Sequence, residues 1–170
     1  MNARRLKNWG FVLAVALALV VLAGCNREHG FKGTVYKPTI PAPTLVGTQA
    51  DGTAFDLKNL AGKVVMLFFG YTSCPDICPL ALADMKQVET LLGGSSEDVA
   101  VVFATLDPER DTPERLRTYL NAFDPSFIGV TMSEAQLAQA KKDFGVFSEK
   151  VVPEASQSSA DYLINHTGWT

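Results

Sequence analysis

The chain has 170 residues, of which 47% are hydrophobic, and this is enough for one domain with a buried core. Its 15 Lys and Arg stand against 18 Asp and Glu, a formal net charge of −3. With this acidic balance and no basic stripe along the chain, a nucleic acid is not the expected partner.

The first 24 residues have the pattern of an export signal. Arg4, Arg5 and Lys7 form a basic start, and an apolar stretch follows over residues 11–22. This stretch is shorter than the about 20 apolar residues that a membrane span needs. It ends at residues 22–25 (Leu-Ala-Gly-Cys), which resemble a bacterial lipobox, where the cysteine is diacylated and becomes the first residue of the mature protein.

Two interpretations of this segment both place the remaining chain outside the cytoplasm and at a membrane. In the favoured one, residues 1–24 are a lipoprotein signal peptide, and lipidated Cys25 holds the protein in the bacterial cell envelope, facing the periplasm or the cell exterior. In the other, residues 12–23 remain as an uncleaved anchor helix. Residues 25–43 are predicted to be a tether, because glycine and proline recur there. His29 is expected to be a solvated side chain of that tether.

From residue 44 onward strands and helices alternate in the pattern. The run at 63–71 is continuously apolar, with β-branched and aromatic residues, as in a strand buried on both faces. The predicted strands are 44–48, 54–57, 63–71, 99–106, 127–131, 146–151 and 162–164. The predicted helices are 79–92, one from Pro113 capped by Thr112, and 133–144 opened by the capping-box pair Ser133 and Gln136. This order predicts an α/β fold with a largely parallel sheet in three layers.

Two cysteines follow the strand predicted at 63–71. Cys74 and Cys78 lie at its carboxyl end, where parallel α/β sheets form ligand sites. Pro79 suits the first position of a helix, which makes Cys78 the expected N-cap and places both sulfurs at the positive end of the helix. This position is expected to lower the thiol pKa values and to favour thiolates, the form that attacks electrophiles and binds metals.

A third group would complete a metal site. Two thiolates and one imidazole suit Cu(I) or Cu(II), whereas zinc usually takes a fourth ligand or a water. The candidate imidazole is His166, although its spacing suits a strand-end residue bonded to the backbone equally well. Asp76 is interpreted as a turn or capping residue. Asp107 is expected at the same rim of the sheet, and helix capping accounts for Asp111.

Four segments of the chain resemble the Sco/SenC family of thioredoxin-fold copper chaperones, which serve assembly of the copper A centre of cytochrome c oxidase. They are residues 68–79, 106–113, 123–129 with 142–146, and 161–167. The resemblance covers nearly all of the predicted domain, residues 44–170. It implies that Cys74, Cys78 and His166 bind copper. It also implies two kinds of partner, namely the copper A subunit of the oxidase and a thiol reductant or copper donor.

One departure from that family concerns the end of the chain. Members of the family continue past the histidine with a strand, a hairpin and a final helix, whereas this sequence stops at Thr170. The expectation is therefore a thioredoxin-like domain without its C-terminal elements, which would leave a strand edge and an apolar face exposed.

Other functions of the same thiols stay open at this point. A thiol–disulfide oxidoreductase acting on an oxidase subunit or another exported protein would use Cys74 and Cys78 as attacking and resolving groups. Against this enzyme, three residues separate the cysteines, where redox motifs have two. A thiol peroxidase is disfavoured because Tyr71, and not threonine, stands three residues before Cys74. An inert structural disulfide would leave His166 unexplained. The leading prediction is a metallochaperone and not an enzyme.

Overall fold

The computed structural model describes residues 33–35, 38–154 and 161–168. Cys25, His29 and the predicted signal peptide lie outside the described residues. The chain divides into two units, Met1–Pro41 and Ala42–Thr170, and the elements below all belong to the second. In the part of the chain that is described, no helix is both long enough and apolar enough to cross a membrane.

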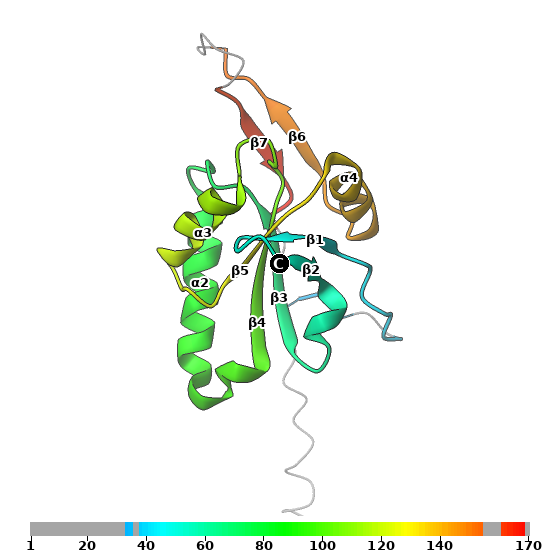
Figure 1. The fold of residues 1–170 in the computed structure, drawn as a ribbon, viewed down its shortest axis with the longest axis vertical. Helices are drawn as coiled ribbons and strands as arrows, with labels where there is room; N and C mark the ends of the chain where they lie inside the picture. Colours follow the sequence, from blue (N-terminus) through cyan, green and yellow to red (C-terminus); the bar gives the residue numbers. More distant parts are fainter. Residues whose placement is uncertain (1–32, 36–37, 155–160, 169–170) are drawn as a thin grey trace, which may run out of the picture. The chain divides into compact units, whose positions relative to one another are not determined.

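A five-stranded sheet forms the centre of the second unit (Figure 1). Its strands lie in the order β2-β1-β5-β4-β3. Their bounds are β1 Val46–Gln49, β2 Ala54–Asp56, β3 Val64–Gly70, β4 Val99–Thr105 and β5 Ile128–Thr131. The predicted parallel arrangement holds for β3, β4 and β5, whereas β1 runs antiparallel to both β2 and β5. The sheet is therefore mixed, because a short turn joins β1 to β2 and a tight hairpin connects only antiparallel strands.

Helices cover both faces of this sheet. Figure 1 shows α2 (Ile77–Leu92) and α3 (Pro113–Asn121) on one side and α4 (Glu134–Asp143) on the other. Ring contacts support this arrangement. The ring centroids of Phe103 in β4 and Tyr119 in α3 are 5.9 Å apart, and those of Phe69 in β3 and Phe144 just after α4 are 5.5 Å apart. The predicted three-layer α/β fold is thereby confirmed. Short 3₁₀ helices at Leu57–Leu60 and Gly93–Asp98, which were not predicted, precede β3 and β4.

The start of α2 differs from the prediction. The helix begins at Ile77, two residues earlier than expected, so Cys78 lies inside its first turn and Asp76 takes the N-cap position without a side-chain hydrogen bond. Pro79 is compatible with this start because N–H groups of the first turn have no partner within the helix. The other two helix starts are confirmed: Thr112 caps α3, and the capping box of Ser133 opens α4.

The last two strands form a sheet of their own. β6 (Ser148–Val151) and β7 (Leu163–His166) pair only with each other among the described residues, in antiparallel register. Figure 1 places this pair beyond the end of the five-stranded sheet at which β3 and β4 finish. Tyr162 and Ile164 are buried while Leu163 and Asn165 are exposed, so one face of β7 packs onto the domain.

Candidate metal centre

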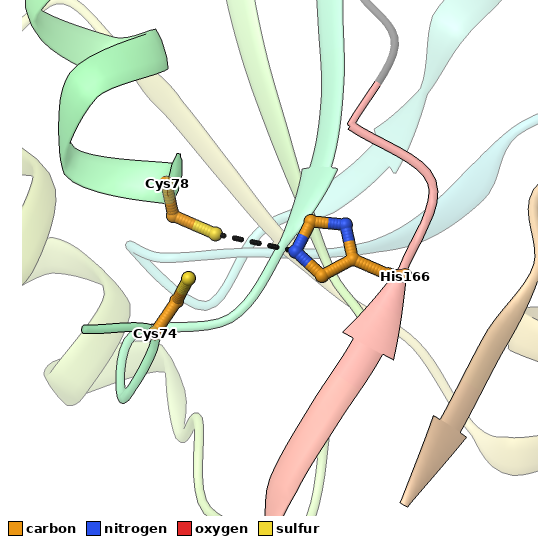
Figure 2. A group of neighbouring side chains, drawn as sticks. All are labelled: Cys74, Cys78 and His166. Atoms are coloured by element: carbon orange, nitrogen blue, oxygen red, sulfur yellow. Dashed lines mark hydrogen bonds between the residues drawn. The ribbon is translucent and has the colours of Figure 1, made fainter. Parts of the chain in front are cut away.

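Two neighbouring cysteines and a histidine from the far end of the sequence converge at the carboxyl end of β3. Cys74 lies in the loop after β3, Cys78 in the first turn of α2, and His166 at the end of β7. Figure 2 shows the two sulfurs and the imidazole ring around one space. We call these three residues the metal group. Their ligand atoms all lie within 4.8 Å of one another, and Cys78 Sγ is 3.6 Å from His166 Nε2. Both cysteines are free thiols.

The backbone orients the ring of His166. Its Nδ1 lies 2.9 Å from the carbonyl oxygen of Thr167, and a carbonyl can only accept, so Nδ1 carries the proton and donates it. In the neutral ring Nε2 then carries the lone pair, and this atom faces the sulfur of Cys78. The rings of Phe68 and Tyr71 contact the imidazole edge-on, at centroid distances of 6.1 and 5.9 Å. This is the tautomer and the orientation of a histidine ligand, fixed before any ion binds.

The two thiols have different environments. Cys78 has 0% exposure, and this burial raises the pKa of its thiol far above the ordinary value. The predicted lowering of the thiol pKa by the helix end is therefore wrong for Cys78, because the loss of solvent around the sulfur outweighs the favourable field of α2. Cys74 is partly exposed. An ion held by both sulfurs would displace the proton of Cys78, and Cys74 is the more accessible of the two sulfurs.

Gly70, the last residue of β3, makes room for the buried sulfur. A Cβ atom at this position would lie 2.8 Å from Cys78 Sγ, 2.8 Å from Cε1 of Phe68 and 2.9 Å from Cε2 of Phe103. Real Cβ atoms essentially never come this close to another heavy atom. The strand end and α2 can therefore approach only because position 70 has no side chain, a role that no local pattern in the sequence reveals.

Asp111 holds the loop that carries Cys74. It is fully buried and accepts hydrogen bonds from the Thr72 backbone N–H at 2.9 Å, from the Thr72 hydroxyl, and from the Thr105 hydroxyl at 2.6 Å. The prediction that Asp111 serves helix capping is thus wrong, since Thr112 is the cap of α3. Asp111 and Thr112 are both suitable capping residues, and the sequence alone does not show which of the two points into the domain. The role of Asp111 could therefore not be predicted.

Asp107 lies just past β4, at the rim where it was expected, but it is not a member of the metal group. It has 0% exposure, accepts a hydrogen bond from the Tyr162 hydroxyl at 2.6 Å and forms an ion pair with Arg110. Asp76 is exposed and also stands outside the group. Among the described residues the site therefore has three donors. The nearby carboxylates of Asp107 and Asp111 instead form hydrogen bonds with the segments that carry these donors.

The donor set and its spacing fit one soft metal ion. Metal–sulfur and metal–nitrogen bonds in proteins are about 2.0–2.3 Å long, so donors around one ion lie at most about 4.5 Å apart. The three ligand atoms lie within 4.8 Å, so they need little movement to reach bonding distance. Two sulfurs and a neutral imidazole are donors that suit copper, the metal expected from the sequence.

Comparisons of the sequence and of the fold with known proteins all point to one family. The model of the SCO1/SenC family matches residues 43–170. An SCO2-like protein of Rickettsia conorii is 38% identical over 120 residues, which cover 71% of this chain and 58% of that protein. The chain thus spans just over half the length of this curated relative.

Two solved structures have the same fold. Bradyrhizobium japonicum ScoI, solved with copper bound, superimposes with a TM-score of 0.69 at 34% identity, covering 76% of this chain and 80% of that one. Apo Sco1 from Thermus thermophilus also gives a TM-score of 0.69, at 37% identity, covering 84% of this chain and 80% of the other. The three-layer fold is therefore thioredoxin-like, as predicted. The chain belongs to the SCO1/SenC family.

Proposed function

We propose that this protein binds one copper ion through Cys74, Cys78 and His166 and delivers it during assembly of the copper A centre of cytochrome c oxidase. The observation that carries the proposal is the convergence of two thiols with one suitably oriented imidazole, although Cys78 and His166 are 88 residues apart in the sequence. The copper in the related Bradyrhizobium structure supports the choice of metal.

The unequal exposure of the two thiols suggests how copper would leave the site. A partner thiol could approach Cys74, which is partly exposed, while His166 and the buried sulfur of Cys78 would still hold the ion. Exchange of ligands would begin at Cys74 and end when Cys78 takes up a proton, which its raised pKa favours. Delivery through this order needs no change in the fold.

Location and partners are part of the same proposal. The signal pattern of residues 1–24 and the lipobox-like end at Cys25 support a lipoprotein in the bacterial cell envelope. The proposed partners are the copper A subunit of the oxidase, which takes the ion, and a copper donor or thiol reductant. A reductant is required because two neighbouring free thiols tend to form a disulfide in an oxidising compartment.

A second candidate is a thiol–disulfide oxidoreductase that uses Cys74 and Cys78 as its redox pair. The closeness of the two free thiols favours it. Only Cys74 is placed to attack a substrate disulfide, because the sulfur of Cys78 is buried and its pKa is raised. This chemistry would not need His166, so a variant of His166 separates the two functions.

The test is the copper content and absorption spectrum of the reduced protein, measured beside His166→Ala and Cys78→Ser. We expect one copper per chain with a sulfur-to-copper charge-transfer band. The band should change in His166→Ala and disappear in Cys78→Ser. A folded and reduced protein that takes up no copper would refute the proposal, and disulfide reductase activity that persists in His166→Ala would then favour the oxidoreductase.

A further inference from the structure

In the described part of the chain, the strand that carries His166 is not paired with the five-stranded sheet. Among the described residues, β7 pairs only with β6, and the hydrogen bond from Thr167 N–H to the Phe147 carbonyl continues that same pairing. The ladder of the five-stranded sheet therefore does not fix where β7 lies relative to Cys78. Side-chain contacts must do so.

A partly buried ionic cluster provides such contacts at the start of β7. We call Asp107, Arg110 and Tyr162 the anchor cluster. Asp107 accepts from the Tyr162 hydroxyl at 2.6 Å and pairs with the guanidinium of Arg110. Arg110 also donates from Nη1 to the carbonyl oxygen of Tyr162 at 2.9 Å, and its guanidinium carbon lies 3.6 Å from the centroid of the Tyr162 ring. Tyr162 is thus held through its hydroxyl, its ring and its backbone.

The chemistry of the cluster makes this a specific point of attachment. Asp107 has 0% exposure, and a buried carboxylate is costly unless a charged and hydrogen-bonding partner meets it. Arg110 meets that need from the same loop, and its flat guanidinium can stack on a ring while it donates hydrogen bonds in plane. An apolar contact could slide along β7, whereas these directional bonds allow one position only.

The cluster connects to the metal group along the strand. Tyr162, Ile164 and His166 alternate with exposed residues, so all three face the domain, and four residues of strand place His166 about 13 Å from Tyr162. The guanidinium of Arg110 also lies 5.9 Å from the ring of Tyr71, whose edge contacts the imidazole of His166. A shift of β7 at Tyr162 would therefore move Nε2 away from the sulfur.

We propose that the anchor cluster positions His166 for copper, by fixing β7 so that Nε2 stays beside Cys78 Sγ. Arg110 and Tyr162 are positioning residues, since neither offers an atom to the metal group. The inference rests on the proposed copper function. It assigns the loop after β4 a task in the site, although that loop contributes no ligand.

The test is Tyr162→Phe, which removes the hydroxyl that bonds to Asp107 and keeps the ring under Arg110. The matched control is Tyr119→Phe, because the buried Tyr119 hydroxyl has no hydrogen-bond partner in the described part of the chain. Copper affinity should fall about 10- to 100-fold in Tyr162→Phe, as for other groups that orient a ligand, and should stay unchanged in the control. Arg110→Lys, which keeps the charge but loses the planar fork, should act in the same direction.

Two further readouts separate positioning from general stability. In the His166→Ala background, Tyr162→Phe should cause no additional loss of copper affinity, since the ligand it positions is already gone. In the metal-free protein, the nitrogen NMR signals of His166 should show the Nδ1-protonated tautomer, and Tyr162→Phe should shift them toward a mixture of tautomers.

The outcomes distinguish this inference from the proposed function. No copper in the folded wild-type protein would refute the function, and the metal-free NMR signals of His166 would then decide the positioning role by themselves. Wild-type copper affinity in Tyr162→Phe, or an equal loss with and without His166, would overturn the inference. Loss of cooperative unfolding in Tyr162→Phe would also overturn it, because the cluster would then support the whole domain and not the ligand.

Discussion

The backbone of Gly70 lies directly against the sulfur of Cys78: a Cβ atom on Gly70 would stand 2.8 Å from that sulfur. The end of a buried strand and the first turn of α2 thus meet without a side chain between them. The position of one proposed copper ligand therefore depends on a residue that has no side chain to bind metal.

We expect Gly70→Ala to push the Cys78 sulfur out of the metal group. Overpacking of a core usually costs about 1–3 kcal/mol of the free energy of unfolding, and the displaced sulfur should also lower copper affinity. Urea unfolding and copper titration measure the two effects. The control is Gly94→Ala, where a Cβ would meet nothing within 4 Å. Equal copper affinity in both variants would show that the close approach does not matter to the site.

Asp111 should stabilise the loop of Cys74 and the domain together. Asp111→Ala leaves the Thr105 hydroxyl and the Thr72 N–H without their acceptor, so we expect a loss of about 2–4 kcal/mol in the free energy of unfolding. Urea unfolding measures this loss. Asp84→Ala removes the same charge from an exposed position of α2 and should change stability by less than about 0.5 kcal/mol. Similar results for the two variants would contradict the role of Asp111.

The raised pKa of Cys78 predicts a loss of stability in mild alkali. An exposed thiol in the unfolded chain ionises at about pH 8.5, whereas burial keeps the folded thiol neutral to higher pH. The folded state therefore loses stability as the pH rises above about 8.5, and Cys78→Ala should remove this dependence. Unfolding by urea at pH 7.5, 8.5 and 9.5 measures it in the reduced, metal-free protein. The same slope in Cys78→Ala would exclude Cys78 as its source.

Thiol modification gives a separate check on the two cysteines. Iodoacetamide should alkylate Cys74 first in the reduced, metal-free protein, because Cys74 is partly exposed and Cys78 is buried and neutral. Cys78 should react only after denaturation. Peptide mass spectrometry at short reaction times resolves the order, and faster modification of Cys78 would refute the assignment of Cys74 as the accessible sulfur.

At acid pH, the ion pair of Lys86 and Asp124 should affect the free energy of unfolding. The Lys86 ammonium and the bonds from Ser126 lower the pKa of Asp124 to about 2. A lowered pKa means that the contribution of Asp124 is present above the ordinary value near 3.9 and is lost as the pH falls toward 2. Lys86→Ala should raise the pKa of Asp124, which an NMR titration of its carboxyl carbon measures. An unchanged pKa would show that Ser126 alone accounts for the effect.

The long apolar runs made most of the fold predictable from the sequence. β4 is buried along almost its whole length and β3 toward its carboxyl end, so neither shows a clear alternation, and the bounds of both strands lie within one residue of the prediction. The starts of α3 and α4 were predicted because their caps use local side-chain bonds. The start of α2 was not, since Pro79 fits several positions of a first turn and Asp76 makes no capping bond.

The three candidate ligands could be predicted from the sequence, but the residues that hold their segments in place could not. The resemblance named Cys74, Cys78 and His166, and the structure brings these three together. The separate pairing of β6 with β7 and the buried bonds of Asp111 depend on contacts between distant segments, which no local pattern contains. The predicted direction of the Cys78 pKa shift was wrong for the same reason, because the burial of a side chain depends on how the whole domain packs.

X-ray absorption at the copper edge can identify the atoms around the metal, in the reduced wild-type protein loaded with one equivalent of copper and in His166→Ala treated in the same way. We expect two sulfur neighbours and one imidazole nitrogen in the wild-type protein, and two sulfurs without the imidazole in the variant. Identical spectra from the two proteins would contradict this expectation, because His166 would then not be a ligand.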